Sequence, residues 1–77
     1  MKFSEHECGV LTMNLPVESL EKGDAGTVVH IHDEGAAYEV EFMALDGHTV
    51  AVATVEAAGL RPVSRHDLSH ARELRAG

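Results

Sequence analysis

The chain has 77 residues, of which 44% are hydrophobic and 25% charged, and its formal net charge is −7 at pH 7. This length holds one small domain, and the composition excludes an intrinsically disordered chain and a membrane-spanning run of about 20 apolar residues. The single cysteine, Cys8, excludes an internal disulfide.

The opening residues, Met1–Glu7, lack the apolar core of a signal peptide, and together with the lone thiol they favour a cytoplasmic location. Residues 1–60 carry 11 acidic and two basic side chains, a balance of −9, whereas residues 61–77 carry four arginines and two acids. An acidic body repels a phosphate backbone, so we expect no nucleic-acid partner. We also expect no membrane partner, because no run of about 20 apolar residues is present. Solubility alone accounts for the acidity, and recruitment of a basic protein is the sharper alternative.

Five short strands are predicted from runs of β-branched and alternating residues, joined by turns. In chain order they cover residues 9–13, 26–32, 38–42, 48–55 and 60–63. Asp33-Glu34-Gly35 and Asp46-Gly47 predict hairpin turns, because each places a glycine where a positive φ is needed. The segment 56–59 is too short for a regular helix and predicts a single 3₁₀ turn. A mainly β fold follows, with the small size favouring a five-stranded SH3-like barrel over residues 1–63.

The clearest strand is the third, in which apolar and acidic side chains alternate. Tyr38, Val40 and Phe42 share one face and Glu39 and Glu41 the other. A half-buried strand with its acids in water explains this pattern. The two glutamates are therefore our first candidates for contact with a partner.

The end of the chain, residues 64–77, predicts a short C-terminal helix as a second unit beside the barrel. Ser64 suits the N-cap and Asp67 follows at the capping-box spacing. The helix would present a thin apolar stripe to the barrel, to a partner or to a second copy of the chain, formed by Leu68, Ala71 and Leu74.

Several short elements at fixed spacing carry a resemblance to a known family. They are Val10-Leu11-Thr12, Leu15-Pro16, the run Leu20-Glu21-Lys22-Gly23-Asp24-Ala25-Gly26-Thr27-Val28-Val29, Tyr38-Glu39-Val40-Glu41-Phe42, Asp46-Gly47 and Leu60-Arg61-Pro62-Val63. Over residues 8–63 the chain resembles the small bacterial family of domain of unknown function 4926. The resemblance implies an SH3-like barrel without known enzymatic activity. It also implies an accessory protein, with an antitoxin or immunity-like role as one form of that function.

Histidines supply the alternative function. His30 and His32 are two residues apart on one predicted strand, so their side chains share a face and are candidates to hold one metal ion. No third ligand is set by the sequence spacing. A small metal- or ligand-binding barrel is the resulting alternative, although no cofactor is expected.

Catalysis has little support in the sequence. Cys8 and His6 are close along the chain but lack a third group to position them. Glu39 and Glu41 on an exposed strand have nothing to desolvate them and raise a carboxyl pKa. We therefore expect a non-enzymatic protein-interaction module that uses Glu39, Glu41 and the tail stripe.

Overall fold

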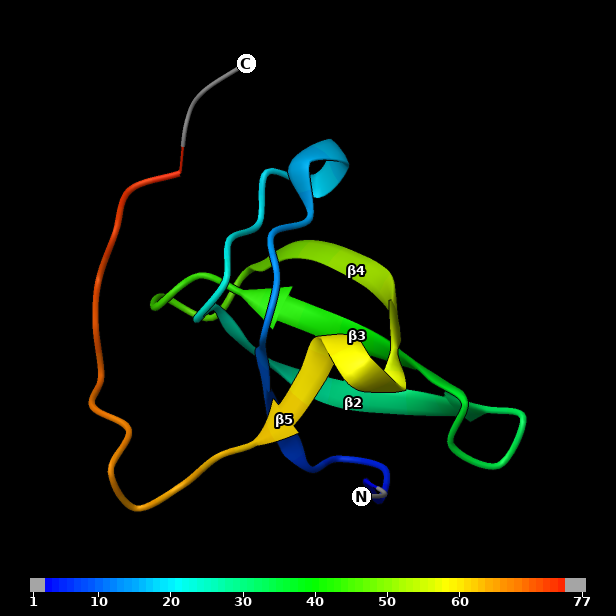
Figure 1. Ribbon diagram of the computed structural model, residues 1–77. Coiled ribbons are helices and arrows are strands. Elements are labelled where there is room, and N and C mark those ends of the chain that lie inside the picture. The colour runs from blue at the N-terminus through cyan, green and yellow to red at the C-terminus, as the bar shows by residue number, and fades with distance from the viewer. Residues whose placement is uncertain (1–2, 75–77) are drawn as a thin grey trace.

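Five antiparallel strands form a single sheet in the computed structural model, which describes residues 3–74 (Figure 1). The strands and two 3₁₀ turns are β1 (Cys8–Leu11), η1 (Pro16–Glu18), β2 (Ala25–His32), β3 (Ala37–Met43), β4 (Thr49–Glu56), η2 (Ala57–Gly59) and β5 (Leu60–Pro62). Their order across the sheet is β4-β3-β2-β1-β5. The predicted mainly β class is confirmed, and each predicted strand is present with ends shifted by at most two residues.

The core lies on the inner face of the bent sheet and is centred on β3. Tyr38 and Val40 have no exposed surface, and Phe42 is 3% exposed. Around them pack the other residues of the same buried cluster, Phe3, Leu11, Leu20, Val28, Ala53, Val55 and Leu60. The predicted alternation in this strand is therefore correct, since its apolar side chains are buried and its glutamates face outward.

Tyr38 ties the start of the chain to the sheet. Its ring meets that of Phe3 edge to face, with centroids 5.1 Å apart, and its hydroxyl accepts a hydrogen bond of 3.2 Å from the Phe3 backbone N–H. This hydrogen bond satisfies a buried hydroxyl that would otherwise destabilise the core. The tyrosine thus acts both as core filling and as an anchor for residues before β1.

The closed barrel expected from the sequence is not confirmed. Among residues 3–74, β4 pairs only with β3 and β5 only with β1, so the sheet they form is open between β4 and β5. These two strands are neighbours along the chain, joined by η2. β5 is three residues long and contains Pro62, which has no N–H to donate to another ladder.

The predicted C-terminal helix is wrong for the residues described. From Val63 to Leu74 the chain forms one turn at Arg65 and His66, is otherwise irregular, and runs past the end of the sheet that carries the β3–β4 turn (Figure 1). Asp67 does accept a hydrogen bond of 2.7 Å from the Ser64 N–H, as a capping pair would. However, a helix this short is marginal in water. Ion pairs of the tail with Arg61 on β5 and with Asp24 in the loop before β2 hold the chain extended instead. Within residues 3–74 no helix is long and apolar enough to cross a membrane.

Gly26 allows β2 and β3 to approach closely. A Cβ at this position would lie 2.7 Å from Val40 Cγ1 and 2.8 Å from the Glu41 carbonyl oxygen. Backbone atoms cannot give way as a flexible side chain can. The glycine that opens the Gly-Thr-Val-Val run is therefore required by packing against β3.

We predict that Gly26→Ala lowers the free energy of unfolding by about 1–3 kcal/mol, the usual cost of overpacking a core. Ala25→Ser, at the exposed neighbouring position, should change it by less than about 0.5 kcal/mol. Urea denaturation followed by circular dichroism measures both values. Equal stability of Gly26→Ala and the wild type would show that β2 and β3 are not this close.

Candidate functional site

The outer face of the sheet carries the two glutamates predicted to contact a partner. Strand register places side chains in rows across this face. One row runs through Cys8, Thr27, Glu41 and Val52, a second through His30, Glu39 and Thr54, and a third through His32, Ala37 and Glu56. Glu39, Glu41 and Glu56 therefore lie on one surface, which we call the acidic face.

Hydrogen bonds hold the glutamates of β3 in place. Thr54 Oγ1 donates to Glu39 Oε1 at 2.7 Å, and Thr49 Oγ1 donates to Glu41 Oε2 at 2.6 Å. The second oxygen of Glu39 lies 2.9 Å from His32 Nε2. The hydrogen bonds from His32 and then Thr54 lower the pKa of Glu39 below the ordinary glutamate value, against a smaller opposing effect of burial. Glu39 is therefore ionised at neutral pH.

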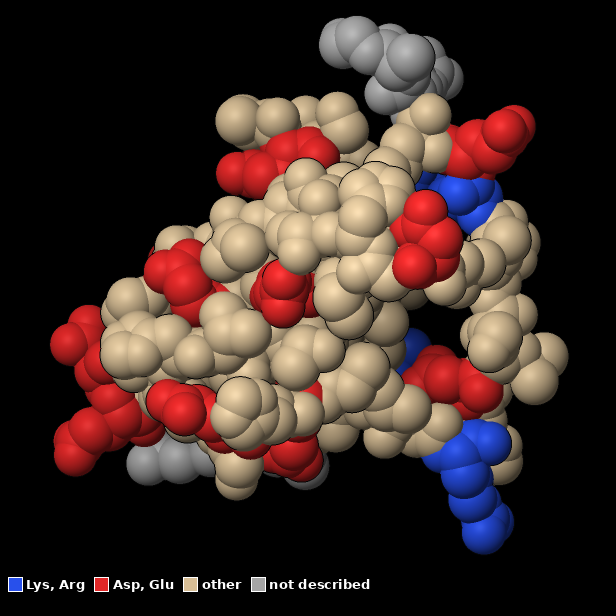
Figure 2. All heavy atoms as spheres, turned by 180° about the vertical axis from the view of Figure 1, so that it is seen from behind, with Lys and Arg blue, Asp and Glu red and all other residues tan. Residues whose placement is uncertain are grey.

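No lysine or arginine within residues 3–74 forms an ion pair with Glu39 or Glu41. The described arginines that form ion pairs do so elsewhere, with Asp67, Glu21 and Asp24. Figure 2 shows acidic side chains spread over the side of the molecule that includes the β2–β3 hairpin, whereas basic side chains lie toward the tail. The negative charge of Glu39 and Glu41 is thus fixed in position but not neutralised by a lysine or arginine of the described residues.

His30 and His32 lie side by side on this face, as the spacing predicted. Their rings meet edge to face with centroids 4.8 Å apart. The described residues contain no group of three or more histidine, cysteine or acidic side chains placed to hold a metal ion. The metal site stays a prediction, which a rise in melting temperature with zinc, abolished by His32→Ala, would support.

The tail residues predicted to form a stripe do not share one helical face. Leu68 is 91% exposed and Leu74 is 41% exposed. Ala71 and Leu74 instead line one side of a shallow groove of about 370 Å³. Its other side is formed by the end of the β3–β4 hairpin and the loop before β2, including Leu20, Phe42, Met43, Leu45 and Val50.

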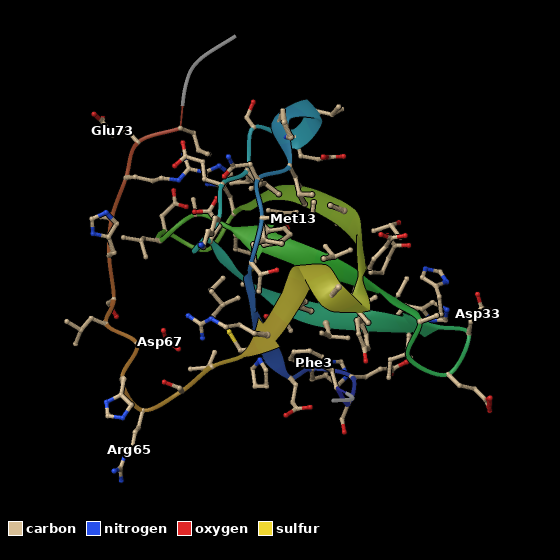
Figure 3. All side chains as sticks on the ribbon, in the orientation of Figure 1. Phe3, Met13, Asp33, Arg65, Asp67 and Glu73 are labelled. Carbon is tan, nitrogen blue, oxygen red and sulfur yellow. The ribbon has the colours of Figure 1, made fainter. Side chains whose placement is uncertain are left out.

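Two arginines fix the tail to the sheet. Near its start, Arg61 on β5 makes a bidentate pair with Asp67, with N···O distances of 2.9 and 2.8 Å, and Arg65 points away from the sheet (Figure 3). Farther along, Arg72 Nε donates to Asp24 Oδ1 at 3.0 Å, and its Nη2 donates to the second oxygen of Asp24. The Arg72–Asp24 pair, which we call the clasp, brings together residues 48 positions apart.

The clasp is partly shielded from water, with 24% of the Arg72 side chain and 20% of the Asp24 side chain exposed. Burial by itself raises the pKa of Asp24, but hydrogen bonds from Arg72 and from the Glu21 N–H outweigh it, so the pKa is lowered. Arg72 also donates to the Ser19 carbonyl oxygen at 3.2 Å. The tail is thus attached to the loop before β2 chiefly through this one arginine.

Sequence reasoning missed the clasp and the hydrogen bonds of the glutamates. Arg72 lies within the predicted C-terminal helix, and Asp24 lies just before the second predicted strand. No local sequence pattern predicts a salt bridge between residues so far apart in the chain. In contrast, the threonines opposite Glu39 and Glu41 follow once the third and fourth predicted strands are paired, because strand residues in register share a face.

The fold and the acidic face define a small antiparallel β domain without a deep enclosed site among its described residues. The model of the family named domain of unknown function 4926 matches residues 5–62, most of the chain, so the protein belongs to that family. No curated protein matches the chain, and no solved structure does.

We predict that Arg72→Ala frees the tail while the sheet remains folded. The steady-state heteronuclear NOE of residues 68–73 should fall sharply at pH 7, because the clasp is their principal attachment. Arg65→Ala removes the same charge from a side chain that points into solvent and should leave these values unchanged.

Lowering the pH should also free the tail of the wild-type protein. Because the folded-state pKa of Asp24 is lowered, the clasp contributes fully above the ordinary value of 3.8 and is lost as the pH falls through the lowered value. In the Asp24→Asn variant, the tail should be mobile at every pH. A rigid tail in that variant at pH 7 would contradict this account of the clasp.

Proposed function

We propose that this domain is a non-enzymatic interaction module whose acidic face binds a basic segment of a protein partner. The observation that carries the proposal is the pair Glu39 and Glu41, held by threonine hydroxyls and paired with no lysine or arginine within residues 3–74. Carboxylates fixed in advance lose little side-chain entropy when a cation binds.

The distribution of charge supports the same function. The net charge of −7 attracts a basic partner at long range and speeds its association. Because Arg61 and Arg72 are used to fix the tail, they do not compete for the acidic face. In this proposal the clasped tail, with Leu68, Ala71 and Leu74, provides a second, apolar contact next to the groove.

We further propose an accessory role and a relationship to SH3-like barrels. In an accessory or immunity-like role, the domain would bind a basic partner protein and neutralise its activity. The SH3-like relationship is supported by the strand order, because the two open edges, β4 and β5, are joined directly by η2 and would meet if the sheet closed.

The test is titration with an oligolysine peptide, followed by fluorescence anisotropy. Binding should weaken steeply as salt rises, as expected for exposed charges. The double variant Glu39→Gln/Glu41→Gln keeps oxygens that accept from the threonines and should bind about tenfold more weakly, equivalent to about 1.4 kcal/mol.

The matched control is Glu34→Gln/Glu73→Gln, which removes the same charge from the β2–β3 hairpin and from the tail. It should weaken binding by less than about threefold, since only long-range attraction is lost. Equal losses in both double variants would show that net charge alone attracts the peptide. The acidic face would then not be the site.

A further inference from the structure

The two edges of the sheet differ in how far they are protected from pairing with another strand. β5 is short, contains Pro62, and has the Arg61 guanidinium folded back onto the Pro62 carbonyl at 3.0 Å. β4 has eight residues, none of them proline, glycine or a basic residue. Natural sheets protect their edges with prolines, lysines and short strands, so β4 lacks the usual protection.

β4 is also ordered for pairing along most of its length. Residues Ala51–Glu56 pair with β3 in unbroken register, and the register shift lies beyond them, at Phe42 and Met43. Thr49 and Thr54 are fixed by their bonds to the glutamates. Within residues 3–74 no strand pairs with the outer edge of β4, so alternate N–H and C=O groups along that edge have no strand partner.

The negative charge next to the outer edge of β4 favours a partner strand with basic side chains. A strand added to β4 would lie about 4.8 Å from β4 and roughly twice that distance from β3. On the acidic face its side chains would stand beside Val52, Thr54 and Glu56, with Glu39 and Glu41 one strand farther in. Glu56 is within reach of a basic side chain on the added strand, because diagonal neighbours on paired strands are about 7–8 Å apart. Glu39 and Glu41 are roughly 10 Å away, two strand spacings, which an extended lysine or arginine and an extended glutamate span together.

The other face of the added strand would lie beside apolar side chains of β4. There its neighbours on β4 are Ala51, Ala53 and Val55, which are half-buried or buried at the rim of the core. Apolar side chains fit that rim. The segment that matches both faces has lysine or arginine at every second position and apolar residues between them.

We propose that β4 is a strand-addition site for such an extended segment of a partner protein. The inference rests on the proposed function and states how the basic partner docks. Main-chain hydrogen bonds along β4 provide affinity, and Glu39, Glu41 and Glu56 select the alternating cations.

A second copy of the chain fits this edge poorly. Pairing of β4 with the same strand of another molecule would continue the sheet and place the three glutamates of each copy on one surface. Like charges on facing or neighbouring strands destabilise pairing, and each copy carries a net charge of −7. Charge complementarity thus favours a basic partner over self-association.

The experiment uses the full chain and a capped heptapeptide of alternating lysine and valine. Its control is the same peptide with N-methyl groups on all central residues, which keeps the charge but removes the backbone donors. Anisotropy should show at least about tenfold weaker binding of the methylated peptide. Hydrogen exchange should slow at alternate β4 amides only with the unmethylated one.

A pair of protein variants tests the same edge. Val52 is 54% exposed on β4, and Leu45 is 88% exposed on the β3–β4 turn. Val52→Lys, which adds both bulk and a repelling charge to the edge, should weaken binding at least about tenfold. Leu45→Lys adds the same charge off the edge and should have less than a threefold effect. Circular dichroism checks that both variants are folded.

The outcomes separate the two proposals. Equal affinity for both peptides would overturn strand addition and leave the acidic face as a purely electrostatic site. No binding of either peptide would overturn the proposed function and the docking mode together. A doubled mass in solution with β4 amides protected before any peptide is added would overturn the inference in favour of pairing between copies.

Discussion

The alternation of side chains along β3 is the constraint on which the rest of the molecule depends. Tyr38, Val40 and Phe42 must point inward because they supply the fully buried centre of the core. The pleat then forces Glu39 and Glu41 outward. Because β3 pairs on both sides, the same alternation sets the rows of the acidic face and the register of β4. A slip of one residue would bury two carboxylates.

Much of this arrangement could be predicted from the sequence. The period-two pattern of residues 38–42 gave the faces of β3 correctly, and the glycine-containing turns placed its neighbours. The 3₁₀ turn after β4 is confirmed at Ala57–Gly59. These features are local, since each depends on propensity and spacing within a few residues. The fold class and the glutamates of the proposed site therefore followed directly.

What could not be predicted depends on contacts between distant parts of the chain. The predicted capping hydrogen bond between the Ser64 N–H and Asp67 is present. However, Asp67 also accepts hydrogen bonds from both Nη atoms of Arg61. Together with the clasp, this pair holds the tail extended, where local rules predicted a helix. Whether the sheet closes depends likewise on how β4 and β5 meet across η2. Neither the extended tail nor the open sheet can be predicted from the residue pattern of a single segment.

Among residues 3–74, β3 is paired on both sides, whereas β4 is paired on one side and open on the other. Amide hydrogen exchange of the free protein at neutral pH tests this most directly. It should show uniformly slow exchange along the centre of β3 and an alternation of slow and fast amides from Ala51 to Val55, since only every second amide points at β3. Uniformly slow exchange along β4 would contradict the account, because its outer edge would then already be covered.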